Sequence, residues 1–317
     1  MPSPRSLIGA VALRGLRGIV EGLRAKPPDI QCSGDRMHEK IDFALKMIRK
    51  RLLRQPTTCP YCKSGKTILL QRKQILLELR ECQECRLRFR YPKDDVIENF
   101  DYYQDDYQQQ TVTDLPSDAE LEGHIRDNFR RVGRDISEHL EVIRQFATGG
   151  RLLDFGASWG YCTWQFQQAG YDAIGYEISH PRTEYGKKML GVKMVTNTHD
   201  LPDQSIDVIY SSHVLEHMPD PGATLREFRR LLAPQGSLFV FVPNGAGEPA
   251  RRLGVKWTPL INQRHVMAYT PQFFAIALPR EGFVTKFACA PYREPLRQYS
   301  PSALPFDGEE LLAVGSR

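Results

Sequence analysis

The chain has 317 residues, enough for one large domain and a smaller one, and its 41% hydrophobic and 26% charged residues are typical of a globular protein. The longest apolar run near its start, residues 7–13, is far shorter than the roughly 20 residues that cross a membrane. The net charge of +5 is unevenly distributed: residues 1–92 contain 20 basic and 8 acidic side chains, and the remainder carries −7. The excess of basic side chains in residues 1–92 favours an anionic partner, such as a membrane surface, nucleic acid or a phosphorylated substrate. A basic face exposed to solvent accounts for this excess equally well.

Residues 1–55 are predicted to form a basic, helical N-terminal segment. Three interpretations of the arginine-rich residues 1–30 are open: an amphipathic helix at a membrane surface, a transit peptide, or a frayed tail. We favour the tail or a weak membrane contact, because four glycines weaken any helix there. Residues 36–55 predict a better helix, which Pro56 ends. Its apolar side chains recur at helical spacing: Ile41, Leu45, Ile48 and Leu52.

Two C-x-x-C pairs follow within residues 56–93. Cys59 and Cys62 form the first pair, and after a 19-residue gap Cys82 and Cys85 form the second. Each pair makes a tight turn that aims two thiolates at one point, and two strand-like runs between the pairs form a hairpin that brings them together. Four sulfur ligands leave no open position for water, so the spacing predicts a structural zinc site rather than a redox dithiol. Cysteines used in this way also favour a reducing compartment, which we expect to be the cytoplasm, near the inner face of the membrane if the basic N-terminus contacts it.

Residues 94–150 are predicted to form a helical linker or lid. The linker begins acidic and rich in tyrosine and glutamine, and a helix over 121–146 ends before two glycines. Tyr102, Tyr103 and Tyr107 are candidates to cap a pocket, although packing is the favoured role. From residue 151 onward, strand-like and helix-like runs alternate, which is typical of an α/β domain with a parallel sheet covered by helices.

The stretch LLDFGASWGYC, residues 152–162, places a glycine-containing turn between an apolar strand and a helix. It fits the dinucleotide pattern G-x-G-x-x-G poorly, because Ser158 and a tyrosine stand at the later glycine positions. The pattern D-x-G-x-[GS]-x-G fits better, and its Asp154 would repel a phosphate but suits a cationic ligand. S-adenosylmethionine is such a ligand, with a sulfonium and an ammonium group and no phosphate. Gly156 and Gly160 would let the backbone approach it closely.

A second strand ends near Glu177, 23 residues after Asp154, where a carboxylate can accept hydrogen bonds from both ribose hydroxyls. Further strands are predicted over 206–210, over 237–242 and within the C-terminal EELLAVGSR. The chain from 151 to 244 resembles class I S-adenosylmethionine-dependent methyltransferases at the glycine turn, the acidic end of the second strand, LPDQSIDVIYSSHVLEHMPDP and LLAPQGSLFVFVPN. With the cysteine pairs and a later W-x-x-L…H…YTP…GF pattern, the resemblance extends to a bacterial subfamily with an N-terminal zinc ribbon.

The resemblance implies a Rossmann-like, seven-stranded methyltransferase domain over residues 151–317, preceded by the zinc ribbon, with S-adenosylmethionine and a structural Zn²⁺ as cofactors. It places these residues at the cofactor: Asp154, Gly156, Ser158, Gly160, Glu177, Asn197 and Ser212. Asn197 stands where the family often has an aspartate facing adenine, and its amide oxygen can still accept a hydrogen bond from the adenine amino group. The implied activity is O- or C-methylation of a small-molecule or glycan-type acceptor.

Methyl transfer from a sulfonium is an in-line displacement, so the enzyme mainly has to align acceptor and methyl in a dry cleft. A base helps where the acceptor is a hydroxyl or an acidic carbon. The loop after the strand at 206–210 offers His213 and His217, with Glu216 beside them, and His265 lies in a loop expected to return over the same cleft. Each of these histidines also has a purely structural alternative.

Two other functions remain open. One is an RNA methyltransferase that docks RNA on the basic zinc ribbon, although the (D/N)-P-P-(Y/F) motif of base-amino methyltransferases is absent where SSHV stands. The other is a protein that binds S-adenosylmethionine without turnover. A small-molecule or saccharide acceptor is therefore the expected partner, and nucleic acid is less favoured.

Overall fold

The computed structural model describes residues 34–95, 114–303 and 305–317. The chain divides into two units, residues 1–46 and Met47–Arg317, and helix α2 (Gly34–Leu52) runs across the boundary between them. The helix expected over 36–55 is therefore present, but all four residues of its apolar stripe are exposed. The expectations for residues 1–33 and for Tyr102, Tyr103 and Tyr107 lie outside the described residues. Within the described ranges, no helix is both long and apolar enough to span a lipid bilayer.

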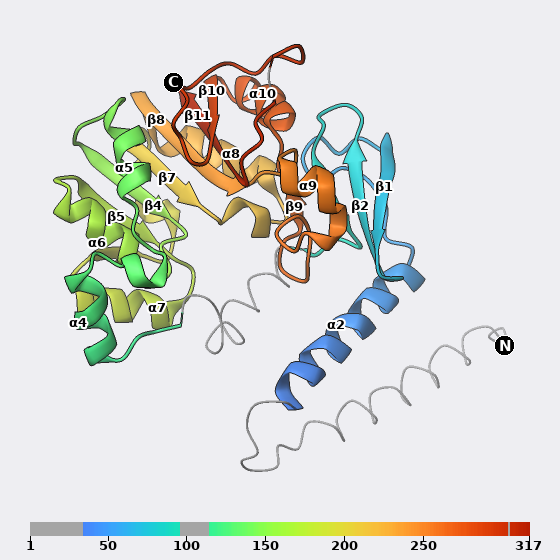
Figure 1. Cartoon of the computed structure of the whole chain (residues 1–317), viewed down its shortest axis with the longest axis horizontal. Helices are drawn as coiled ribbons and strands as arrows, with labels where there is room; N and C mark the ends of the chain where they lie inside the picture. Colours follow the sequence, from blue (N-terminus) through green and yellow to red (C-terminus); the bar gives the residue numbers. More distant parts are fainter. Residues whose placement is uncertain (1–33, 96–113, 304) are drawn as a thin grey trace, which may run out of the picture. The chain divides into compact units, whose positions relative to one another are not determined.

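The cysteine-rich segment contributes three strands to a four-stranded antiparallel sheet, whose fourth strand comes from much later in the chain (Figure 1). The strands, in the order in which they pair, are β1 (Thr67–Lys73), β2 (Leu77–Cys82), β3 (Arg88–Tyr91) and β9 (Met267–Ala268). Arg88 is paired with Ala268, and Phe89 with Met267. The hairpin predicted between the two cysteine pairs is present, and β9 completes its sheet.

The second sheet has seven strands in the order β10-β11-β8-β7-β4-β5-β6 (Figure 1). The strands are β4 (Arg151–Phe155), β5 (Asp172–Tyr176), β6 (Lys193–Val195), β7 (Ile206–Ser212), β8 (Leu232–Pro243), β10 (Val284–Cys289) and β11 (Glu310–Ser316). Neighbours from β6 to β8 are parallel, whereas β11 pairs antiparallel with both β8 and β10. The carboxyl ends of the parallel strands and the start of β11 therefore meet at one edge of the sheet.

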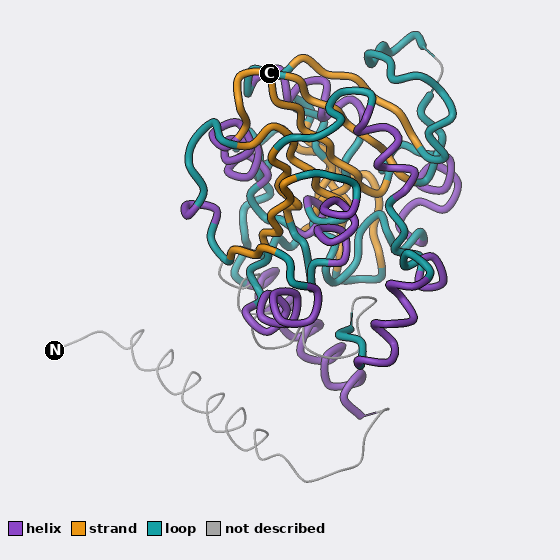
Figure 2. Tube along the Cα trace, turned by 90° about the vertical axis from the view of Figure 1, so that its left-hand side faces the viewer, coloured by secondary structure: helices purple, strands orange, loops and turns teal. Residues whose placement is uncertain are grey.

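Helices cover both faces of this sheet (Figure 2). The α-helices of this part are α4 (Asp118–Arg126), α5 (Ser137–Arg144), α6 (Tyr161–Gln168), α7 (His180–Tyr185), α8 (Pro221–Leu231), α9 (Glu248–Leu253) and α10 (Pro271–Arg280). The single helix predicted over 121–146 is wrong. Residues Asn128, Phe129 and Gly133 adopt left-handed conformations with φ of 53°, 61° and 64°, which break the segment between α4 and α5.

Alternate residues of the central strands face two separate cores. Leu152 of β4 packs in a cluster with residues of α5 and α6, whereas Leu153 packs on the other face with residues of α8 and α10. The second cluster also contains Cys59, Cys82, Leu87 and Phe89. The cysteine-rich sheet therefore shares a hydrophobic core with the large sheet.

Candidate active site

The turn between β4 and α6 has the conformation that its glycines permit. Gly156, Ser158 and Gly160 have positive φ values of 85°, 51° and 86°. The backbone carbonyl of Tyr176, at the end of β5, accepts hydrogen bonds from the backbone N–H groups of Gly156 and Ala157, both at 2.9 Å. The turn predicted from the sequence is therefore held directly against the end of the neighbouring strand.

Two glycines of the turn cannot be replaced without crowding. A Cβ atom on Gly156 would lie 2.3 Å from Cγ2 of Val214, and one on Gly160 would lie 2.8 Å from Cγ2 of Val192. Val214 belongs to the loop that follows β7. The glycine at position 156 thus allows that loop to pack directly against the turn.

Asp154 is buried one residue before the end of β4. Its Oδ2 accepts a hydrogen bond of 2.7 Å from the hydroxyl of Thr163 on α6, a partner that the sequence did not single out. Burial raises the pKa of Asp154 to about 7, and the nearby charge of Glu177 acts in the same direction, although Thr163 partly offsets both. A cationic ligand beside this carboxyl group would favour its ionised form.

Glu177 follows β5 and binds two backbone groups. One carboxylate oxygen accepts from the N–H of Ser158, and the other accepts from the N–H of Ser179, both at 2.9 Å. Burial raises the pKa of Glu177, and the Ser179 N–H and the guanidinium of Arg182 act against this shift. Arg182 is itself buried and donates to the Ser158 hydroxyl at 2.9 Å. The sequence did not reveal Arg182, which stands in the helical turn after the strand.

The two remaining predicted cofactor residues lie at the carboxyl ends of two other strands of the sheet. Asn197 follows β6, and its side-chain oxygen accepts a hydrogen bond of 3.0 Å from the N–H of His199. Ser212 is the last residue of β7. Both positions are at the carboxyl edge of the parallel strands, as are the glycine turn and Glu177, and this edge is where open α/β sheets bind ligands.

The loop after β7 begins with His213, which has a positive φ of 53°. Its Nδ1 lies 3.3 Å from Oε1 of Glu216, and its Nε2 lies 2.5 Å from Oε2 of Glu310. Desolvation lowers the pKa of His213, but hydrogen bonds to the two carboxylates outweigh it and raise the pKa to about 10. The imidazole is therefore protonated at neutral pH in this arrangement.

Glu310, at the start of β11, connects several side chains that the sequence analysis did not link. It contacts His139 of α5 through the imidazole Nε2 at 3.3 Å, and it accepts a hydrogen bond from the hydroxyl of Tyr292. The other nitrogen of His139 lies 2.9 Å from the hydroxyl of Tyr210. Burial opposes the ionisation of Glu310, but His139 and His213 hold its pKa well below the usual range. No signal in the sequence connects Glu310 to these side chains, because His139 and His213 lie 171 and 97 residues away in the chain.

His217 and His265, the other two predicted catalytic residues, lie together. Their ring centroids are 4.7 Å apart and their planes are nearly perpendicular. Burial lowers the pKa of His217 to about 4. The structure thus brings His217 and His265 into contact with each other, and His213 contacts Glu216 beside them. Whether any of the three takes part in the reaction stays a prediction.

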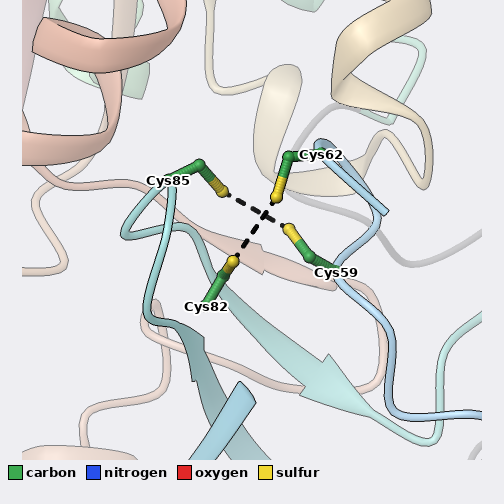
Figure 3. A group of neighbouring side chains, drawn as sticks. All are labelled: Cys59, Cys62, Cys82 and Cys85. Carbon is green, nitrogen blue, oxygen red and sulfur yellow. Dashed lines mark hydrogen bonds between the residues drawn. The ribbon is translucent and has the colours of Figure 1, made fainter. Parts of the chain in front are cut away.

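The four predicted zinc ligands converge on one point (Figure 3). The sulfur atoms of Cys59, Cys62, Cys82 and Cys85 all lie within 4.8 Å of one another. The closest pairs, Cys59 with Cys85 and Cys62 with Cys82, are 3.4 Å and 3.5 Å apart. Four converging cysteine sulfurs are a donor set that fits tetrahedral Zn²⁺.

Strand β3 connects this cysteine cluster to the loop after β7. The Arg90 N–H donates to the carbonyl of Val266, and the Val266 N–H donates to the carbonyl of Glu216, both at 2.8 Å. The Arg88 side chain donates to the carbonyl of Gly245 at 2.6 Å and pairs with Glu81 at 2.8 Å. These contacts tie β3 to the loop after β7, and the side chains of Arg88 and Arg90 are both engaged within the fold.

The strand order, with an antiparallel last pair next to β8, and the glycine turn at the carboxyl edge define a class of protein, the Rossmann-like methyltransferases. A family model described as a methyltransferase domain matches residues 124–285, just over half of the chain. The chain therefore belongs to the methyltransferase domain family, in the S-adenosylmethionine-dependent class I.

The curated proteins that the chain resembles share less than 30% of its residues over the matched regions. The chain is 27% identical to a malonyl-[acyl-carrier protein] O-methyltransferase of Yersinia pestis, over 46% of this chain and 55% of that protein. It is 28% identical to a ubiquinone biosynthesis O-methyltransferase of Aeromonas salmonicida, over 30% of this chain and 44% of that protein. The chain thus spans about half the length of the curated relatives it matches. A solved structure from Thermotoga maritima, described as a possible histamine N-methyltransferase, covers 63% of this chain and 96% of its own, with 18% identity and a TM-score of 0.46.

Proposed function

We propose that the protein transfers the methyl group of S-adenosylmethionine to an oxygen atom of a small-molecule or glycan-type acceptor. The proposal is carried by the two buried carboxyl groups, Asp154 and Glu177, that flank the glycine turn of a methyltransferase domain. Oxygen is favoured as the acceptor atom because the curated relatives are named as O-methyltransferases.

Each of these residues has a defined part in binding. A carboxylate has about four lone-pair sites, so Glu177 can accept from the two ribose hydroxyls in addition to its two backbone partners. Asp154 lies where its charge would stabilise the positively charged end of the donor. S-adenosylmethionine supplies the activated methyl group when bound, and the chain holds the acceptor in line with it. Of the three predicted histidines, His217 and His265 are the candidates for the group that takes up a proton from the acceptor, because the imidazole of His213 already carries both of its protons at neutral pH.

The cofactor assignment is tested by calorimetric titration of S-adenosylmethionine into the wild type and Glu177→Gln. Hydrogen bonds to a charged group contribute about 1.5–3 kcal/mol, so we expect affinity to fall by about 10- to 100-fold. Glu184→Gln, which changes an exposed glutamate on α7, is the matched control and should leave affinity unchanged. Thermal unfolding of both variants separates lost binding from lost structure. Equal affinity in the wild type and a folded Glu177→Gln would remove the ribose assignment.

The acceptor assignment is tested by release of S-adenosylhomocysteine in the presence of hydroxylated sugars, phenols, carboxylic acids and bulk RNA. We expect turnover with a compound from the first three groups, and alanine variants of the three histidines should show which side chain supports it, with a loss of about 100-fold or more for a base. Turnover with RNA alone would replace the proposal with the RNA methyltransferase alternative. Binding of the donor with no turnover on any acceptor would favour the non-catalytic alternative.

We also propose that Cys59, Cys62, Cys82 and Cys85 hold one structural Zn²⁺. The support is the convergence of four sulfurs from two tight turns, which leaves no ligand position for a substrate. Metal analysis of the purified protein should find one zinc per chain, and Cys82→Ser should lose it. Cys289→Ser, which changes a cysteine outside the cluster, is the control and should keep it. A zinc-free wild type that unfolds at the same temperature as the native protein would argue against a structural metal.

Thiolate ligands must stay reduced, so we propose a reducing compartment such as the cytoplasm as the site of action. A weak contact between the basic N-terminus and a membrane surface remains a prediction about residues outside the described ranges.

A further inference from the structure

A second group of metal-ligating side chains lies on the loop after β7. Glu216, His217 and His265 each present one ligand atom within 4.8 Å of the others. They come from two segments that are joined by the backbone hydrogen bond from Val266 to Glu216. None of the three belongs to the cysteine cluster, so this is a separate group.

The two imidazoles are oriented by their outer nitrogens. Nδ1 of His217 lies 3.2 Å from the carbonyl oxygen of Arg264, and Nδ1 of His265 lies 2.7 Å from the carbonyl oxygen of Pro259. Because a carbonyl oxygen only accepts, each Nδ1 carries the proton and each Nε2 keeps its lone pair. Histidines that bind metals commonly donate their other N–H to a backbone carbonyl in this way.

Glu216 would supply the anionic ligand. Its side chain is only 2% exposed, and Oε1 is engaged by His213, whereas Oε2 has no hydrogen-bond partner among the residues that the structure describes. A buried carboxylate oxygen without a partner is energetically unfavourable, and a cation next to it would remove the penalty.

We propose that Glu216, His217 and His265 bind one divalent transition-metal ion, such as Mn²⁺, Fe²⁺, Co²⁺ or Zn²⁺. Two imidazoles and one carboxylate suit these ions, and three protein ligands leave coordination positions open. The group follows β7 at the same sheet edge as the glycine turn. Resting on the proposed function, the open positions would take the oxygen atoms of the acceptor, and a metal ion there would lower the pKa of the acceptor hydroxyl in place of a histidine base. This favours acceptors with two neighbouring oxygen donors over those with a single hydroxyl.

The site is tested by titrating Mn²⁺ into the zinc-loaded, full-length protein and following the loss of the free Mn²⁺ signal by electron paramagnetic resonance. Mn²⁺ prefers oxygen and nitrogen ligands, so it does not compete for the four thiolates. We expect one Mn²⁺ per chain in the wild type, and binding at least tenfold weaker in Glu216→Gln and in His265→Ala. Glu248→Gln and His180→Ala, which change an exposed glutamate and an exposed histidine elsewhere, are the matched controls and should bind as the wild type does.

Two results would overturn the site: a wild type that binds no Mn²⁺, or a Glu216→Gln or His265→Ala protein that binds it as tightly. Because Glu216 is buried, its variant is also checked by thermal unfolding, and His265→Ala decides the matter if that variant does not fold. Calorimetry with S-adenosylmethionine on the same samples keeps the proposals apart. Loss of donor binding would count against the proposed function, whereas loss of Mn²⁺ binding alone concerns the metal site.

Discussion

The glycine turn after β4 and the loop after β7 lie at the same sheet edge but are stabilised differently. At the turn, the carboxyl groups bind neutral partners no more than 19 residues away in the chain: Glu177 accepts from the N–H groups of Ser158 and Ser179, and Asp154 accepts from Thr163. In the loop, charged side chains hold one another across long separations, as in the contact between His213 and Glu310, 97 residues apart. The comparison teaches that the carboxyl groups of the glycine turn, the proposed donor side, are held by partners nearby in the chain. The loop after β7, the proposed acceptor side, depends on the assembled fold.

The largest loss of stability is expected for Gly156→Ala. This change disturbs both the glycine turn and the loop after β7, so it removes the difference between the two regions. A left-handed conformation costs a non-glycine residue about 1–2 kcal/mol, and the new methyl would also clash with Val214. We expect the free energy of unfolding to fall by more than about 2 kcal/mol, measured by urea denaturation, together with a loss of affinity for S-adenosylmethionine.

The control for this prediction is Gly149→Ala, since a Cβ there meets nothing within 4 Å and its φ is not left-handed. Adding Val214→Ala to Gly156→Ala should recover part of the lost stability, because it relieves the clash but not the backbone strain. No recovery in the double variant would show that the loop does not press on the turn.

An intermediate effect is expected for Glu310→Gln, which sharpens the comparison by changing the acceptor side alone. Removing the charge weakens the contacts to His139 and His213, so we expect kcat to fall by about tenfold or more while the dissociation constant for S-adenosylmethionine stays within about twofold. Glu309→Gln, an exposed neighbour, is the control. A loss of donor affinity that matches the loss of kcat would mean that the two sides are not separable.

A further prediction concerns pH and the proposed donor side. The pKa of Asp154, about 7 in the folded protein, lies above its usual value, so the folded state holds an extra proton between about pH 4 and pH 7. Stability due to this group is therefore complete below about pH 4 and is lost as the pH rises through 7. Asp154→Asn should flatten the dependence of the unfolding free energy on pH over this window.

The same ionisation should appear in ligand binding. The titratable groups around Asp154 are Glu177 after β5, Cys162 of α6 and Tyr210 of β7, and none of them is cationic. A cationic donor favours the ionised carboxylate, so affinity for S-adenosylmethionine should rise from pH 6 to pH 8 and should rise less for S-adenosylhomocysteine, which lacks the sulfonium. Identical pH profiles for the two ligands would show that Asp154 does not sense the sulfonium.

The contrast between local and distant contacts also explains what the sequence could predict. The strand–turn–helix unit, Glu177 and the four cysteines were found because each signal lies within a short stretch of chain. The contact of Glu310 with His213 and His139 had no such signal. The break between α4 and α5 was also missed, because Phe129 is fully buried in a left-handed conformation, 6.0 Å from the ring of Trp159, which is a tertiary effect.

The pairing of β3 with β9 affects the order in which parts of the protein can fold during synthesis. Arg88 meets Ala268, which a ribosome adds 180 residues later. At about 5–20 residues per second, that delay is roughly 10–40 s. During this interval the emerging hairpin exposes an unpaired edge while its thiols are already available, so capture of the proposed Zn²⁺ during synthesis would precede completion of the sheet.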